Sequence, residues 1–75
     1  MSKQRTLMVI GAGESQIIAI KSAKRMGHRV VAMDGSPNAK GREFADEFEV
    51  ASTRDVVSAI KIARKYNIDG VLTVS

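Results

Sequence analysis

The glycine pair in Gly11-Ala12-Gly13 directly follows the apolar run Thr6–Ile10. A continuous apolar run of this length is typical of a strand buried on both faces of a parallel sheet. Two glycines at its end permit a tight turn and a close approach to the backbone, as in the G-x-G-x-x-G turn of dinucleotide-binding proteins. The third glycine of that motif is missing, because Gln16 stands in its place. The sequence therefore predicts a phosphate-type turn without the complete dinucleotide signature.

The chain is short and has no cysteine. Its 75 residues are enough for one small domain, residues 1–75, and a chain of this length buries only about 60–65% of the surface that its unfolded form exposes. The lack of cysteine excludes disulfides, cysteine zinc sites and thiol nucleophiles. No apolar run is long enough to span a membrane. Together with the absence of a signal-peptide pattern, this composition predicts a cytoplasmic protein without a membrane partner.

The formal net charge of +4 raises the question of nucleic-acid binding. The basic residues are spread along the chain, and two groups of three lie on the polar sides of two predicted helices: Lys21, Lys24, Arg25, Lys61, Arg64 and Lys65. The chain has only three aromatic residues, too few for a platform on which bases stack. We therefore expect a solvated basic surface and no nucleic-acid partner.

Apolar runs and amphipathic stretches alternate along the chain. Four short runs are predicted strands: residues 6–10, 29–34, 47–51 and 70–74. Two amphipathic stretches are predicted helices, residues 14–26 and 56–66, and a short helical turn falls within residues 39–45. This order predicts an α/β fold, a small Rossmann-like domain of three layers. Its four parallel strands take the order 3-2-1-4, with one main helix on each face.

The helix periodicity assigns an inward face to each helix. The expected inward residues are Gln16, Ala19, Ile20, Ala23 and Met26 in the first helix, and Val56, Ala59, Ile60, Ala63 and Tyr66 in the second. Gly27 and Asn67 are suited to the left-handed conformation that ends a helix. The spacing of Ser52 and Asp55 resembles a capping box at the start of the second helix.

Two helices leave much of a four-stranded sheet uncovered. Ile18 and Val57 also lie off the apolar faces of their helices. The last predicted strand is apolar and lies at an edge, where exposed backbone groups can pair with another chain. We therefore expect a partner, which is the remaining part of a longer protein, a second copy in a homodimer, or both.

The glycine turn is the first candidate site. It lies at the carboxyl end of the first strand, beside the point where the strand order reverses. The turn either is purely structural or binds an anion through backbone N–H groups at the helix N-terminus, where the helix dipole also favours negative charge. Glu14 would repel a phosphate bound directly on the turn. Its carboxylate is suited instead to a hydroxyl, amine or amide of a ligand.

Two further polar residues have open alternatives. Gln16 is either a partly buried amide satisfied by local backbone or an amide that points into the crevice. Asp34 ends the second strand, where it either binds a ligand hydroxyl or accepts hydrogen bonds from its own turn. His28 is the only histidine, so a metal site is not expected. No serine has a paired base, so no catalytic residue is predicted.

Four segments, in this order and spacing, resemble the N-terminal domain of ATP-grasp enzymes: Leu7–Gln16, Gly27–Ala39, Ala45–Val50 and Tyr66–Val74. The resemblance is to the carbamoyl-phosphate-synthase-like, biotin-carboxylase-like and purine-biosynthetic ligases. It implies a pre-ATP-grasp domain that is part of a longer enzyme.

In that family the N-terminal domain lines one wall of the site and helps bind the acceptor substrate, whereas ATP and magnesium lie between two later domains. The resemblance therefore implies no cofactor in this chain, ATP and magnesium in the complete enzyme, and a small-molecule substrate. It assigns substrate-facing positions to six residues: Gly11, Gly13, Glu14, Gln16, Asp34 and Asn38.

Three functions compete at this point. The leading one is the substrate-side domain of an ATP-dependent carboxylate–amine/thiol ligase, which does not catalyse alone. The second is a small NAD(P)- or nucleotide-binding module, against which Gln16 argues. The third is a ligand-free structural domain that self-associates, which the uncovered sheet favours.

Overall fold

The computed structural model describes residues 3–73, in which strands and helices alternate as predicted. The strands are β1 (Thr6–Ile10), β2 (Arg29–Asp34), β3 (Glu47–Val50) and β4 (Gly70–Thr73). The helices are α1 (Ile17–Arg25) and α2 (Val56–Lys65), with short 3-10 turns η1 (Glu14–Gln16) and η2 (Arg42–Phe44). The predicted strand residue Val74 lies outside the described residues.

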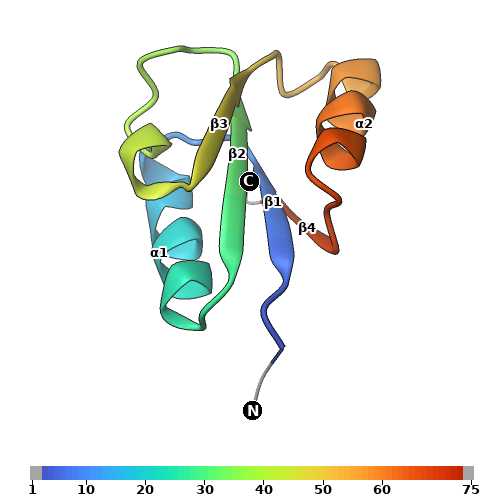
Figure 1. The fold of residues 1–75 in the computed structure, drawn as a ribbon. Helices are drawn as coiled ribbons and strands as arrows, with labels where there is room; N and C mark the ends of the chain where they lie inside the picture. The colour runs from blue at the N-terminus through green and yellow to red at the C-terminus, as the bar shows by residue number, and fades with distance from the viewer. Residues whose placement is uncertain (1–2, 74–75) are drawn as a thin grey trace.

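All four strands are parallel and follow the order β3-β2-β1-β4, which confirms the predicted topology. α1 and α2 lie on opposite faces of the sheet (Figure 1). The molecule is thus a small three-layer Rossmann-like domain. Neither helix within residues 3–73 has the length and apolar character that crossing a membrane requires.

The central strands supply most of the core. Val30, Val31, Ala32 and Met33 of β2 are fully buried, because this strand has a neighbour on each side and a helix on each face. Alternate residues of β1 and β2 point to opposite faces, which produces one cluster under each helix. The α1 cluster consists of Val9, Ala12, Ile20, Ala23, Val30 and Ala32. The α2 cluster consists of Met8, Val31, Met33 and Ile62.

The predicted face of α1 is correct in its centre, whereas the predicted face of α2 includes Ile60, which is 47% exposed. Met26 and Val56 were predicted to point inward, but each is 68% exposed. Met26 is the C-cap residue of α1, beyond its last regular turn, and Val56 is the first residue of α2. Ile62, which was outside the predicted face, is only 7% exposed and packs in the α2 cluster. The buried face of α2 is therefore rotated from the predicted one, away from Ile60 and toward Ile62.

The ends of the helices follow local chemistry. Gly27 and Asn67 have positive φ values of 85° and 53°, as predicted. The predicted capping box is wrong, because Asp55 itself is the N-cap and accepts a hydrogen bond from the Ser58 amide. Ser52 instead accepts from the Arg54 amide and closes a separate local turn.

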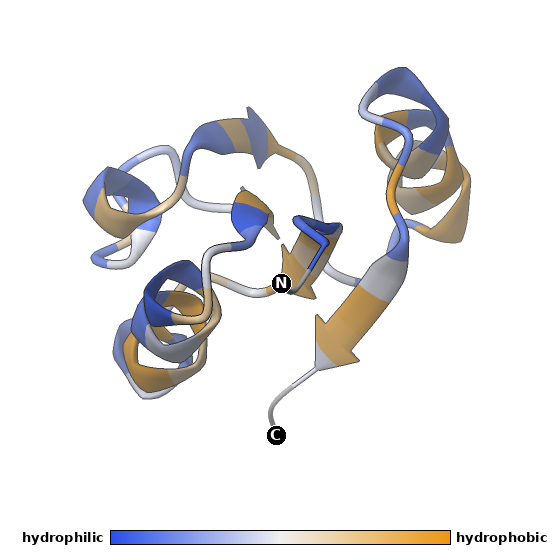
Figure 2. Ribbon diagram, turned by 60° about the horizontal axis from the view of Figure 1, so that its bottom comes forward, coloured by the Kyte–Doolittle hydropathy of each residue, from blue (hydrophilic) through white to orange (hydrophobic). Residues whose placement is uncertain are grey.

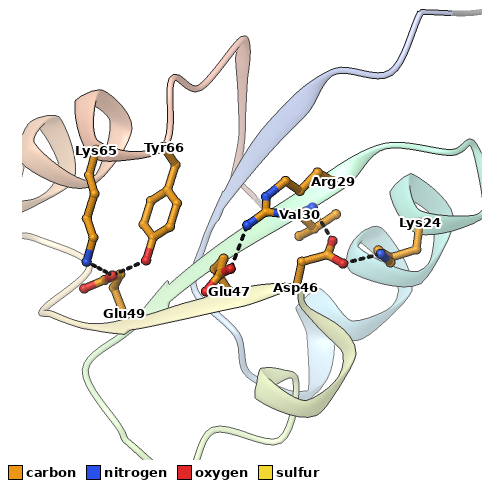
Figure 3. A network of polar contacts seen from close by, with 8 residues as sticks. All are labelled: Lys24, Arg29, Val30, Asp46, Glu47, Glu49, Lys65 and Tyr66. Atoms are coloured by element: carbon orange, nitrogen blue, oxygen red, sulfur yellow. Dashed lines mark hydrogen bonds and ion pairs between the residues drawn. The ribbon is translucent and has the colours of Figure 1, made fainter.

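β3 lies at one edge of the sheet and is held by charged side chains (Figure 3). Just before β3, the Asp46 carboxylate accepts hydrogen bonds from Lys24 of α1 at 2.5 Å and from the Val30 amide at 2.7 Å. Within β3, Glu49 accepts from Tyr66 and from Lys65 at the end of α2. These two carboxylates therefore connect the edge strand to both helical layers.

The same contacts shift the ionisation of both acids. The hydrogen bond from Tyr66, followed by that from Lys65, lowers the pKa of Glu49. Burial alone would raise the pKa of Asp46, but hydrogen bonds from Lys24 and the Val30 amide outweigh it and lower that pKa. A carboxyl group whose pKa is lower in the folded state stabilises the fold above its unfolded pKa, and this stabilisation is lost as the pH falls.

We predict that the free energy of unfolding decreases as the pH falls from about 5 to below the ordinary carboxyl pKa values of about 4. Glu49→Gln should lower stability at pH 7 by about 1 kcal/mol and flatten the pH dependence, because the charge-assisted hydrogen bonds are lost. Urea unfolding at several pH values measures both effects. Glu43→Gln, an exposed acid of η2, is the control and should leave the curve unchanged. An equal slope in the two variants would contradict the assignment to Glu49.

β4 forms the opposite edge and differs from β3 in its side chains. It carries no charged residue, and Figure 2 shows it largely orange at the margin of the sheet. Val71 is 53% exposed. Together with Met8, Ile10, Val56 and Ile60 it lines an apolar cavity of about 250 Å³ between β4 and α2. The β3 edge of the sheet thus carries charged side chains, whereas the β4 edge is apolar.

Candidate functional site

The glycine turn connects the end of β1 to η1. Gly11 has a φ of +97°, which side chains rarely adopt, and its amide donates to the Met33 carbonyl oxygen at 2.7 Å. Gly13, at φ −73°, has ordinary backbone geometry and precedes the 3-10 turn. The first glycine is therefore required by backbone conformation, whereas the second is not.

The buried peptide groups of Ala12 are held from two sides. The Ala12 amide donates to Asp34 Oδ2 at 2.8 Å, and the Ala12 carbonyl oxygen accepts from the Gly41 amide at 2.7 Å. Asp34 Oδ1 also accepts from the Ser36 amide at 2.9 Å, so the predicted local turn at Asp34 is confirmed. The same carboxylate therefore shapes its own turn and fixes the glycine turn. The main chain of the turn is held in place before any ligand arrives.

Gln16 folds back over this turn. Its Nε2 and Cδ lie 3.2 and 3.3 Å from the point where a Cβ atom on Gly11 would stand. Its Oε1 lies 3.1 Å from the corresponding point on Gly13 and accepts a hydrogen bond from Ser15 Oγ at 3.3 Å. The half-buried carboxamide therefore lies across both glycines.

The loop after β2 lies beside the turn. Lys40 Nζ pairs with the exposed Glu14 carboxylate at 3.3 Å, and Gly41 bonds to Ala12 as described. Asn38 is exposed in the same loop and, with Lys40 and Arg42, lines a shallow cavity of about 450 Å³. The structure thus brings together five of the six predicted site residues around the turn. It places Asn38 on the adjoining loop.

Sequence reasoning missed Gly41. A Cβ atom there would lie 2.7 Å from the Ala12 carbonyl oxygen and 3.1 Å from Ile20 Cδ1, so only glycine allows this close approach. The only local signal is a glycine after the loop's proline, which is ordinary loop composition. Its partner lies 29 positions earlier in the chain, from Gly41 back to Ala12, and no periodicity connects them.

We predict that Gly41→Ala destabilises the fold by about 1–3 kcal/mol, because the added methyl group forces the loop away from the turn. Gly35→Ala is the matched control in the same loop. There the nearest atom would be Ser52 Cα at an ordinary 3.8 Å, so the change should be neutral or stabilising by up to about 1 kcal/mol. Urea unfolding compares the two variants. Equal stability would show that the contact between Gly41 and Ala12 is not tight.

The chain matches the N-terminal domain of the ATP-grasp ligases of purine biosynthesis. The chain is 32% identical over 68 residues to the formate-dependent phosphoribosylglycinamide formyltransferase of Synechococcus, with 91% of this chain and 17% of the relative covered. The enzyme of the same name from Chlorobaculum tepidum is 34% identical over 65 residues. No protein-family model matches the chain.

Solved structures agree with this result. The N5-carboxyaminoimidazole synthetase of Staphylococcus aureus in complex with ADP has a TM-score of 0.85 and 27% identity, covering 97% of this chain and 19% of that one. The phosphoribosylglycinamide synthetase of Anaerococcus prevotii has a TM-score of 0.81 and 27% identity, covering 95% and 18%. The chain therefore spans less than a fifth of the length of each of these proteins.

Proposed function

We propose that this chain acts as the substrate-side N-terminal domain of an ATP-dependent carboxylate–amine/thiol ligase of the ATP-grasp type. The observation that carries the proposal is the match to the Staphylococcus aureus synthetase, which covers nearly all of this chain and a small part of that enzyme. Within this class, the resemblance favours the carbamoyl-phosphate-synthase-like and purine-biosynthetic groups. The cysteine-free composition favours the cytoplasm.

The names of the relatives suggest a substrate class. They are synthetases and formyltransferases of phosphoribosylglycinamide and N5-carboxyaminoimidazole ribonucleotide. We therefore propose a phosphoribosyl-bearing small molecule as the substrate, bound along the turn and the loop after β2 with its amine and hydroxyl groups toward Glu14 and its phosphate away from that carboxylate. Its contacts would be Gly11, Gly13, Glu14, Gln16, Asp34 and Asn38, the six positions assigned from the sequence.

The complete enzyme would transfer the γ-phosphoryl group of ATP to a carboxylate or bicarbonate oxygen, releasing ADP. A nucleophile would then attack the acyl carbon and displace phosphate. ATP and magnesium would bind in the other domains, because an exposed carboxylate at Glu14 makes the turn unsuitable for a triphosphate. The role of this domain is to orient one substrate.

We predict that the chain alone neither hydrolyses ATP nor binds NADH tightly, and that it binds phosphoribosylglycinamide weakly. Amide NMR spectra recorded with each compound test this directly. Shifts at Gly11, Gly13 and Asn38 with the ribonucleotide, and not with ATP, are expected. Shifts with NADH at low-micromolar concentration would favour the dinucleotide-binding alternative, and no shift with millimolar ribonucleotide would contradict the proposed substrate class.

We also propose that the isolated chain forms a two-fold homodimer through β4. The apolar edge and the neighbouring cavity between β4 and α2 support this, because such an edge can pair with another chain. If association is the only role of the chain, this proposal becomes the third alternative, a ligand-free structural domain.

We predict a dimer by light scattering at high protein concentration and a monomer for Val71→Asp, because a charge on this edge opposes pairing. Val50→Asp is the matched control on the opposite edge strand, since Val50 is 55% and Val71 is 53% exposed. It should leave the dimer intact. A wild-type chain that is folded, cooperative and monomeric would refute the dimer.

A further inference from the structure

We propose that Gln16 determines the ligand selectivity of the glycine turn by closing it to diphosphate groups. This inference goes beyond the proposed function, because it assigns a role to one side chain and concerns ligands that are excluded. It can be measured on this chain without any ligase activity.

Gly13 is the second glycine of the motif. In dinucleotide-binding turns, that glycine lets the pyrophosphate approach the backbone. Here the space beside Gly13 holds the Oε1 atom of Gln16, 3.1 Å from where a Cβ atom would stand. Gly13 is at an ordinary φ of −73°, so the side chain of Gln16 is what makes use of its missing Cβ atom. The space beside Gly13 is thus occupied by a side chain of the protein itself.

Electrostatic repulsion also opposes the binding of a diphosphate at the turn, in addition to the steric block by Gln16. The Gln16 atom nearest Gly13 is the carbonyl oxygen of the amide, which carries partial negative charge, and Ser15 Oγ donates to it at 3.3 Å. The Glu14 carboxylate adds a full negative charge one residue after Gly13. Lys40 offsets that charge only through an exposed pair at 3.3 Å, and such pairs are weak.

The helix also begins in a different way from a dinucleotide-binding helix. Residues 14–16 form a 3-10 turn, and the regular α-helix begins at Ile17. Because η1 runs directly into α1, the helical segment begins at Glu14. The Glu14 carboxylate therefore lies at the helix N-terminus, where it opposes a phosphate that the helix dipole would otherwise attract.

The first experiment measures binding of ADP and NADH by amide NMR titration. Gln16→Gly should bind both at least about tenfold more tightly than wild type, a difference of about 1.4 kcal/mol. Ile18→Gly is the control, since Ile18 is 73% exposed on the same helix and its replacement weakens the helix without opening the turn. It should bind no better than wild type.

The second experiment is a double-mutant cycle on stability. Gly13→Ala should destabilise the wild-type chain, because the new Cβ atom meets Gln16 Oε1 at 3.1 Å. In a Gln16→Ala background the same change should cost nothing, because the neighbouring atom is gone. A difference between the two costs measures the coupling between residues 13 and 16.

Several outcomes would overturn the inference. They are equal binding of ADP by wild type and Gln16→Gly, equal gain in the Ile18→Gly control, or additive costs in the cycle. Gln16→Ala replaces Gln16→Gly in the titration if the glycine variant does not fold by circular dichroism. The ribonucleotide titration of the wild-type chain tests the proposed function separately, so failure of one can be distinguished from failure of the other.

Discussion

The contacts that fix the Ala12 amide and carbonyl groups hold this fold together at the carboxyl ends of β1 and β2. The Asp34 carboxylate binds the Ala12 amide, and the Gly41 amide binds the Ala12 carbonyl oxygen. Ala12 is fully buried, so removing either partner would leave a buried backbone group without a hydrogen bond, which is costly. Three segments that are distant in sequence, the glycine turn, the end of β2 and the loop before η2, therefore adopt their positions together. Helix α1 follows from the turn and takes its direction from it.

The two edges of the sheet show how the remaining stability is distributed. At β3 and just before it, two carboxylates attach the edge strand to α1 through Lys24 and to α2 through Lys65 and Tyr66. These contacts depend on pH, because they require ionised acids. At β4, Val71 and the exposed side of α2 present apolar surface that no described residue covers. A domain that spans less than a fifth of its relatives has an edge suited to further polypeptide.

The sequence was sufficient for the strand order and insufficient for the contacts between distant loops. Apolar runs such as Thr6–Ile10 and the alternation of strands with helices predicted four parallel strands and their order, because handed crossovers leave few arrangements. Helix faces were predicted less well. A period of 3.6 residues shows which residues form an apolar stripe on a helix, but it does not show which of them the sheet buries. Ile62 and Val56 show this error in both directions. Ser52 and Asp55 are both suitable capping residues, and only the position of the helix start decides between them. Because α2 begins at Val56, Asp55 is the N-cap. The requirement for glycine at position 41 could not be predicted, because it arises from close contact with the Ala12 carbonyl oxygen, which is distant in the sequence.

A glycine motif therefore has more than one physical explanation in the same chain. Gly11 is required by a positive φ, Gly41 by a carbonyl oxygen at 2.7 Å from the position of its absent Cβ atom, and Gly13 by the Gln16 side chain. Only the last of these resembles the space that a phosphate occupies in a dinucleotide-binding turn, and here a side chain fills it. With Gln16 in place of the third glycine, an amide oxygen thus lies beside Gly13, in the space that its missing Cβ atom leaves. The fold can keep the Rossmann-like strand order while its turn is open to a different class of ligand, since the strand order depends on the core and the ligand class depends on the side chains beside the turn, Glu14 and Gln16.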